Sequence, residues 1–156
     1  MIEPIRLAFE VDCPAPQAFT IWTARTSRWW PVTHSVSTQP GLEVLIEPCV
    51  GGRIFERTPT GDEFDWGEVI EWEPPHRFVY LWHLRQDWVD ATEVDITFSP
   101  VDTDRTRVAI EHRGWERLGA RADARREGNL AGWAGLLPKY VQATLDADIR
   151  RSVDLG

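Results

Sequence analysis

Several features that mark other classes of protein are absent from this sequence. The N-terminus has no basic stretch followed by an apolar one, and no apolar run approaches the roughly 20 residues of a membrane-spanning helix. The only two cysteines, Cys13 and Cys49, form no CxxC pair, and the four histidines are scattered along the chain. We therefore expect no secretion signal, membrane span, metal site or disulfide, and we predict a cytoplasmic protein with reduced thiols.

Positive charge is also scarce. The chain has 17 lysines and arginines against 25 aspartates and glutamates, which gives a formal net charge of −8. A surface of that sign disfavours binding to nucleic acid or to an anionic membrane. The sequence contains no GxSxG, HExxH, P-loop or GxGxxG motif, so we expect neither a nucleotide nor another cofactor.

Tryptophan, by contrast, is abundant. Nine tryptophans outnumber the six phenylalanines and two tyrosines together. The 156 residues are 42% apolar and 27% charged, which is typical of a globular chain that buries its own core. We predict a single domain spanning residues 1–156.

The order of hydrophobic patterns predicts the architecture. Residues 5–11 alternate as a strand, and two short helices are expected between them and Pro31. From residue 42 to 115 the alternation returns and predicts six antiparallel strands separated by Gly and Pro turns. Helical spacing then runs from about residue 121 to 152. The predicted fold is α+β, a curved seven-stranded antiparallel sheet wrapped around a long C-terminal helix.

The apolar residues of the last third predict which side of this helix is buried. At 100° per residue, one broad face carries five apolar side chains, namely Leu130, Trp133, Leu137, Val141 and Leu145. Tyr140 and Thr144 adjoin the same face. The three glycines of the segment, Gly128, Gly132 and Gly135, are then expected on the outer face.

The same arithmetic on the strands predicts a group of aromatic and polar side chains beneath the helix. Successive side chains of a strand point to opposite faces, so the inward positions follow from period two. Glu68 belongs to the inward face unless a bulge at Gly67 inverts it. Asn129 lies one helical turn before Trp133, at the edge of the group. The candidate ligand-binding residues are Trp66, Glu68, Tyr80, Trp82, His112, Asn129 and Trp133.

Two interpretations of this group remain open. In one, the rings form a solid core, and each polar tip is hydrogen-bonded locally. In the other, the rings line a hollow that holds a small apolar or aromatic molecule, with polar groups as anchors. If the hollow also supports catalysis, His112 and Glu68 are the candidates for general acid–base chemistry.

Four segments of the sequence resemble a known family. They resemble the branch of the START-like (SRPBCC) superfamily homologous to activators of the ninety-kilodalton heat-shock chaperone ATPase, and the resemblance spans nearly the whole chain. The resemblance implies the helix-grip fold, in a superfamily whose members bind lipids, sterols, hormones or polyketides or act as cyclases. The segments are EPCVGGRIFER, WGEVIEWEPPHRFVYLW, TEVDITFSPVDTDRTRVAIEHRGW and GWAGLLPKYV.

The resemblance also leaves alternatives to simple ligand binding. Similar members often carry a histidine where this chain has Asn129, and asparagine does not titrate. One alternative is a cyclase or hydrolase acting on polyketide-like compounds. Another is a co-chaperone or protein-interaction module, or a homodimer formed through an apolar patch of Val79, Leu81 and Trp88. A binding protein is expected to retain a void of several hundred Å³, whereas an interaction module is expected to have a filled core.

Overall fold

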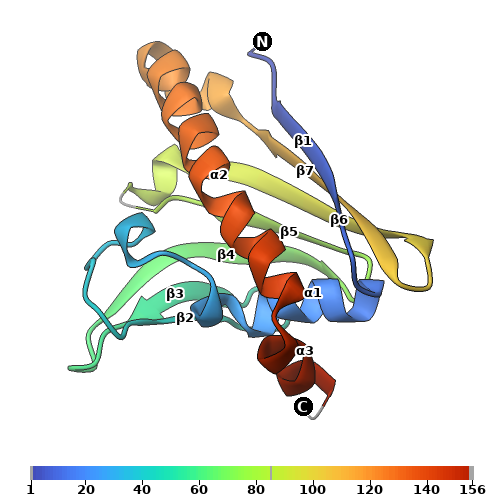
Figure 1. Ribbon diagram of the computed structural model, residues 1–156. Coiled ribbons are helices and arrows are strands. Elements are labelled where there is room, and N and C mark those ends of the chain that lie inside the picture. Colours follow the sequence, from blue (N-terminus) through green and yellow to red (C-terminus); the bar gives the residue numbers. More distant parts are fainter. Residues whose placement is uncertain (1, 85, 155–156) are drawn as a thin grey trace.

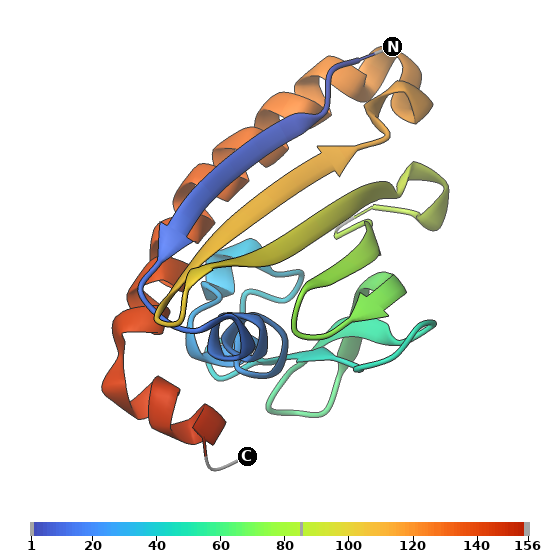
Figure 2. The ribbon, with the colours of Figure 1, turned by 90° about the vertical axis from the view of Figure 1, so that its right-hand side faces the viewer.

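All seven strands form one antiparallel sheet in the computed structural model, which describes residues 2–84 and 86–154. The order across the sheet is β1-β7-β6-β5-β4-β3-β2, so the first strand of the chain pairs with the last one, β7. The sheet curls, and α2 runs alongside β1 (Figures 1 and 2). The strands are β1 (Ile5–Val11), β2 (Glu43–Ile46), β3 (Arg53–Arg57), β4 (Glu63–Glu73), β5 (Arg77–Trp82), β6 (Thr92–Asp102) and β7 (Arg105–Arg113).

The helices occupy the places that the sequence predicts, and this confirms the α+β helix-grip architecture. Helix α1 (Ala15–Ala24) follows β1, and α2 (Ala122–Leu145) crosses the molecule after the last strand (Figure 1). Short 3₁₀ turns are η1 (Thr26–Arg28), η2 (Val32–His34), η3 (Trp88–Asp90) and η4 (Trp115–Arg121). Among the described residues, no helix has both the length and the apolar character needed to cross a membrane.

The C-terminal helix ends earlier than predicted. The backbone becomes extended at Asp146, with φ −78° and ψ 118°, and a separate helix α3 (Ala147–Asp154) follows. The Oδ1 atom of Asp146 accepts hydrogen bonds from the backbone N–H groups of Asp148, at 2.9 Å, and Ile149, at 3.1 Å. This side chain therefore caps the new helix, a role for which aspartate is favoured.

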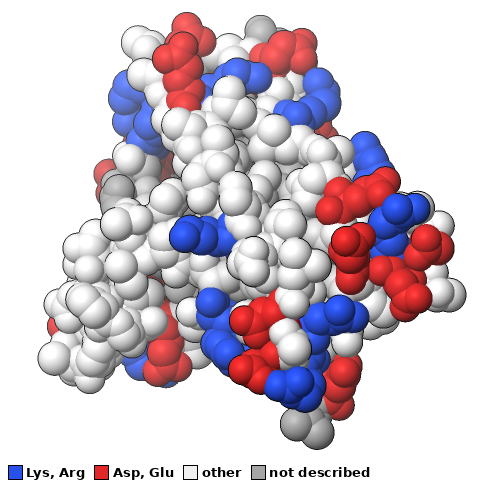
Figure 3. All heavy atoms as spheres, viewed as in Figure 1, with Lys and Arg blue, Asp and Glu red and all other residues white. Residues whose placement is uncertain are grey.

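The buried face of α2 is also rotated from the predicted one. Leu130 and Leu145 are 40% and 53% exposed. Apart from one basic group near its centre, the middle of the molecule in this view is uncharged, and charged side chains gather mainly at the top, right and bottom (Figure 3). Aromatic side chains fix the rotation, because the Tyr140 hydroxyl donates a 2.7 Å hydrogen bond to the carbonyl of Ala18 on α1. The buried residues of α2 are Ala122, Trp133, Leu136, Tyr140, Ala143 and Thr144.

Aromatic rings fill the core between α1, α2 and the sheet. The indole of Trp22 lies 5.0 Å from that of Trp29 and 4.6 Å from the ring of Tyr140, measured between centroids. Trp22 is 1% exposed and Tyr140 is completely buried. At this end of the molecule the rings form the solid core of the first interpretation, and edge-to-face contacts stabilise it beyond burial alone.

Ion pairs cover much of the outer face of the sheet. Arg77 pairs with Glu71 at 2.7 Å and with Asp95 at 3.0 Å, and these two carboxylates are the cross-strand neighbours of Val79. Val79 is 1% exposed, contrary to the predicted apolar surface patch, because the Arg77 side chain reaches across it. Leu81 is half-buried, so of the three predicted patch residues only Trp88, at 48%, is well exposed.

Candidate functional site

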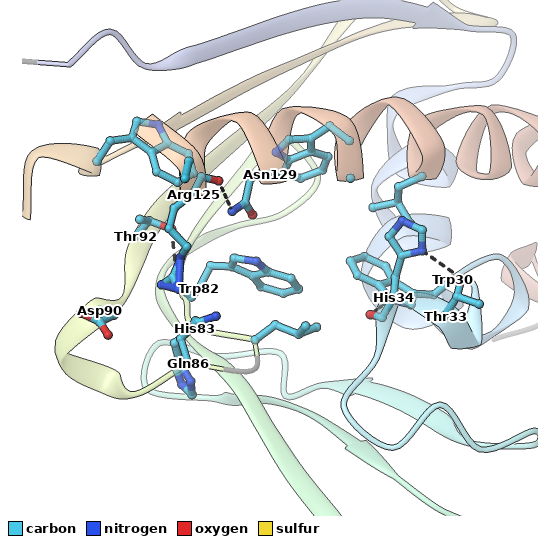
Figure 4. Close-up of a pocket in the computed structure, with 17 residues that line it drawn as sticks. Trp30, Thr33, His34, Trp82, His83, Gln86, Asp90, Thr92, Arg125 and Asn129 are labelled. Carbon is cyan, nitrogen blue, oxygen red and sulfur yellow. Dashed lines mark hydrogen bonds between the residues drawn. The ribbon is translucent and has the colours of Figure 1, made fainter. Parts of the chain in front are cut away.

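A pocket of about 450 Å³ lies between the first half of α2 and the ends of β5 and β6 (Figure 4). This volume falls within the range of pockets that hold small organic ligands. Its lining is mainly aromatic and apolar, with several polar groups. The lining residues are Trp30, Thr33, His34, Trp82, His83, Leu84, Gln86, Asp90, Thr92, Trp115, Ala124, Arg125, Gly128, Asn129, Gly132, Trp133 and Leu136.

Four indole rings supply much of the aromatic wall. Trp30 and Trp82 lie with their ring centroids 5.8 Å apart. The indole N–H of Trp30 donates to the carbonyl of His34 at 2.8 Å, and that of Trp115 donates to the carbonyl of His112 at 2.9 Å. These hydrogen bonds fix two of the rings in place, so they present preformed flat surfaces.

Two glycines of α2 keep the pocket open at the helix. Gly128 and Gly132 line the pocket, contrary to their predicted place on the outer face. A Cβ atom built on either glycine meets no heavy atom within 4 Å apart from its own chain neighbours and helix backbone. The rotation of α2 explains the difference, because the buried face centres on Trp133 and Leu136, next to Gly132. The empty space therefore begins at the helix backbone.

His112 is a core histidine that does not line the pocket. It is 1% exposed, its Nδ1 accepts a hydrogen bond from the Trp133 indole at 3.0 Å, and its Nε2 lies 2.7 Å from the Thr92 hydroxyl. Because Nδ1 accepts, the proton is assigned to Nε2. Burial lowers the pKa of His112 to about 3, so the ring is neutral near pH 7. Its role here is to orient Trp133.

Trp66 and Tyr80 are core residues too. Both are buried, and the void that they border measures about 10 Å³, at the lower limit for a single water. Burial raises the pKa of Tyr80, so its phenol stays protonated. The first interpretation thus describes this layer of rings, whereas Trp82 and Trp133 line the pocket.

Glu68 is separated from this group by an irregularity in β4. Ile54 on β3 pairs with Gly67 and the next residue, Phe55, pairs with Asp65, so Trp66 is an extra residue in its strand. A Cβ at Gly67 would lie 1.9 Å from the carbonyl oxygen of Leu81, so the close strand approach requires glycine there. As a result, Trp66 and Val69 are the buried side chains in this part of β4. Glu68 lies between them in the sequence, is half-buried and does not line the pocket. The bulge expected as an alternative at Gly67 is present.

Asn129 does reach the pocket. Its Nδ2 donates to the backbone carbonyl of Arg125 at 2.8 Å (Figure 4). The Oδ1 atom accepts no hydrogen bond from the part of the chain that the structure describes. That oxygen is available to a hydroxyl or amide donor of a ligand.

His83 lines the pocket, whereas strand alternation predicts that it points outward. Strand β5 ends at Trp82, so the period of two stops one residue earlier, and the ring of His83 packs on Trp88 at 4.0 Å. The residue is 5% exposed, yet its Nε2 has no hydrogen-bond partner within residues 2–84 and 86–154. A buried nitrogen without a partner costs free energy in the folded protein.

Replacing His83 by phenylalanine tests this orphan nitrogen. The ring keeps its packing on Trp88, and the unsatisfied polar atom is removed, so the free energy of unfolding is expected to rise by about 1 kcal/mol. Urea denaturation of both proteins at pH 7.5 measures the change. A fall of 1 kcal/mol or more would show that the imidazole already makes a stabilising polar interaction in the free protein.

Charged residues gather at the end of the pocket near the start of α2. Asp90 accepts two hydrogen bonds from Arg121, at 2.9 and 2.6 Å, which lower the pKa of its carboxyl. Arg125 lines the same end. No group of three or more His, Cys, Asp or Glu side chains that could hold a metal ion occurs in the described ranges.

Sequence comparison connects the chain to one family. The model described as "Activator of Hsp90 ATPase homolog 1-like protein" matches residues 12–142, well over half of the chain. No curated protein sequence matches it.

Solved structures share the fold. The anthrahydroquino-gamma-pyrone synthase Txn09, described as complexed with SUM, is 32% identical, with a TM-score of 0.56, and the match covers 78% of this chain and 82% of that one. CalC from Micromonospora echinospora, a self-sacrificing resistance protein, is 23% identical, with a TM-score of 0.62 and coverage of 97% and 94%. Protein MLL2253 from Mesorhizobium loti is 22% identical, with a TM-score of 0.63 and coverage of 91% and 97%.

Proposed function

This chain belongs to the Activator of Hsp90 ATPase homolog 1-like family of START-like (SRPBCC) proteins, and we propose that it binds a small planar aromatic molecule in the pocket beside α2. The observation that carries the proposal is the lining of this 450 Å³ space, where three indoles lie opposite a helix that contributes a fourth indole and two glycines. Flat rings stack on indole surfaces, and the glycines leave a gap wide enough to admit them.

The similarity to Txn09 supports an aromatic polyketide as the class of ligand. The name of that protein describes a synthase of an anthrahydroquino-gamma-pyrone, a fused aromatic compound. A fused ring system of this kind suits the aromatic character of the pocket walls. A co-chaperone role has less support, because the molecule contains a pocket where an interaction module was expected to have a filled core. In addition, Val79, one of the three residues of the expected surface patch, is buried.

A cyclase is the second candidate function, and one specific observation favours it. Ring closure needs a group that exchanges protons next to the substrate. His112 does not supply it, because its two ring nitrogens are already engaged by Trp133 and Thr92. His83 lines the pocket and its Nε2 has no hydrogen-bond partner among the described residues, so His83 replaces His112 as the candidate general acid or base.

Replacing Trp82 by alanine tests the binding site. Anthraquinone-2-carboxamide, a neutral planar probe, is expected to bind roughly tenfold to a hundredfold more weakly, because removing the ring forfeits about 1.5–3 kcal/mol of contact. Isothermal titration calorimetry measures the affinity, and circular dichroism verifies folding. Trp72→Ala is the matched control, since this half-buried indole packs on Phe19 away from the pocket. Equal affinity of a folded Trp82→Ala protein and the wild type would contradict the assignment of this pocket.

A further inference from the structure

One end of the pocket carries an arginine, Arg125, with the carboxylate of Asp90 nearby. Arg125 lines this end, and it forms no ion pair within 4 Å with any residue that the structure describes. The pocket carboxylate is Asp90, and Arg121 already engages both of its oxygens. The Arg125 guanidinium is thus available to a ligand.

The position of Arg125 in the fold increases this positive potential. It is the fourth residue of α2, close to the helix N-terminus, where the backbone dipole contributes a partial positive charge. Cations are unfavourable at that end of a helix, and Arg121 stands immediately before it. Two arginines, Arg121 and Arg125, therefore stand beside a single pocket carboxylate, Asp90, in a chain whose net charge is −8.

A second, independent feature points to the same end. The unpartnered Nε2 of His83 belongs to a side chain that is 5% exposed and lines the pocket. Arg125 and His83 both lie on one side of the Trp82 ring, whereas Trp30 and His34 lie on the other (Figure 4). Both groups therefore belong to the same part of the pocket lining.

We propose that this end of the pocket is an anion subsite and that the ligand is an acidic aromatic molecule. Its ring system lies against the indoles, and its carboxylate or phenolate oxygen accepts hydrogen bonds from the Arg125 guanidinium and from His83 Nε2. The Oδ1 atom of Asn129 is itself an acceptor, so it pairs with a hydroxyl of the ligand and not with the anion. The inference rests on the proposed function and adds the charge of the ligand.

Two probes of nearly equal shape separate charge from ring binding. Anthraquinone-2-carboxylate is expected to bind the wild-type protein about tenfold more tightly than anthraquinone-2-carboxamide, in calorimetric titrations at pH 7.5 and low salt. Arg125→Gln is expected to remove this preference, so that the variant binds the carboxylate and the carboxamide with equal affinity. His83→Phe is expected to weaken carboxylate binding at least threefold without lowering the melting temperature.

Arg107→Gln is the control, because it changes the net charge by the same amount. Arg107 is an exposed residue of β7, opposite Glu10 and Ser99 in the sheet and outside the pocket lining. Both affinities are expected to stay at their wild-type values in this variant. An equal loss of carboxylate binding in Arg107→Gln and Arg125→Gln would show that net charge, and not a subsite, sets the preference.

The outcomes distinguish the subsite from the binding site. Equal affinity of the two probes for the wild type overturns the anion subsite and leaves aromatic binding intact, as does a preference that survives in Arg125→Gln. If neither probe binds, the proposed function fails and the subsite with it. If Arg125→Gln does not fold, the salt dependence of the wild type decides, because only the carboxylate affinity should fall as salt is raised.

Discussion

Replacing Gly132 by leucine is expected to reduce the affinity for anthraquinone-2-carboxamide at least a hundredfold while the protein stays folded. A Cβ at Gly132 meets nothing within 4 Å, so the leucine side chain extends into the pocket without disturbing the core. The helix itself gains, because glycine costs about 1 kcal/mol relative to a good helix former. Calorimetric titration measures the binding, and thermal denaturation is expected to show an unchanged or higher melting temperature.

The neighbouring residue provides the matched control for this variant. Ala131 is exposed on α2 and does not line the pocket, so Ala131→Leu adds a similar side chain about 100° away around the helix axis, outside the pocket. Its affinity for the probe is expected to equal that of the wild type. Tight binding by a folded Gly132→Leu protein would mean that the probe binds outside the pocket beside α2, and it would contradict the proposed function of this pocket.

The fold was predictable from the sequence because its signals are local. Alternation over residues 5–11 and 92–98 marks strands whose two faces differ in polarity, and the order of elements admits few arrangements. The rotation of α2 was not predictable, because Leu130 and Leu145 have the right spacing but end up exposed. A long-range hydrogen bond from Tyr140 to α1 decides the rotation, and no periodicity contains that information.

The candidate site was predictable only where the regular strands and helix continue. Trp82 was expected under the helix and Trp133 on its buried face, and both line the pocket, although their role in binding stays a prediction. Glu68 was misplaced because the extra residue in β4 reverses the alternation. His83 was missed because it follows the last residue of β5, where alternation no longer applies. The one signal for His83 in the sequence was its position, as a polar residue directly after the aromatic strand that ends at Trp82.

Glu56 carries the largest expected effect on stability. This carboxylate on β3 is completely buried and accepts hydrogen bonds from the Val36 N–H at 2.6 Å, the Ser37 N–H at 3.1 Å, the Ser37 hydroxyl at 2.6 Å and the Trp66 indole at 2.8 Å. It therefore ties the loop after η2 to the sheet. The segment just before this loop brings Trp30 and His34 to the pocket.

Glu56→Gln is expected to lower the free energy of unfolding by about 3 kcal/mol at pH 7.5. The amide keeps one acceptor oxygen, but its NH₂ group faces donors that then have no partner in a buried place. Urea denaturation measures the loss, and Glu43→Gln, an exposed position on β2, is expected to stay within about 0.5 kcal/mol of the wild type. Loosening this loop is also expected to weaken binding of the carboxamide probe, since Trp30 depends on it.

The pH dependence of the stability lost in Glu56→Gln tests whether the ionised carboxylate is responsible for that stability. Burial opposes ionisation of Glu56, but the hydrogen bonds from Ser37, Val36 and Trp66 outweigh burial and lower its pKa. A lowered pKa in the folded state means that the full stabilisation is present above the unfolded value of about 4.3 and declines as the pH falls below it. The stability gap between wild type and Glu56→Gln is therefore expected to narrow from pH 5 to pH 3. A gap that stays constant over that range would show that the loop is held by packing and not by the ionised carboxylate.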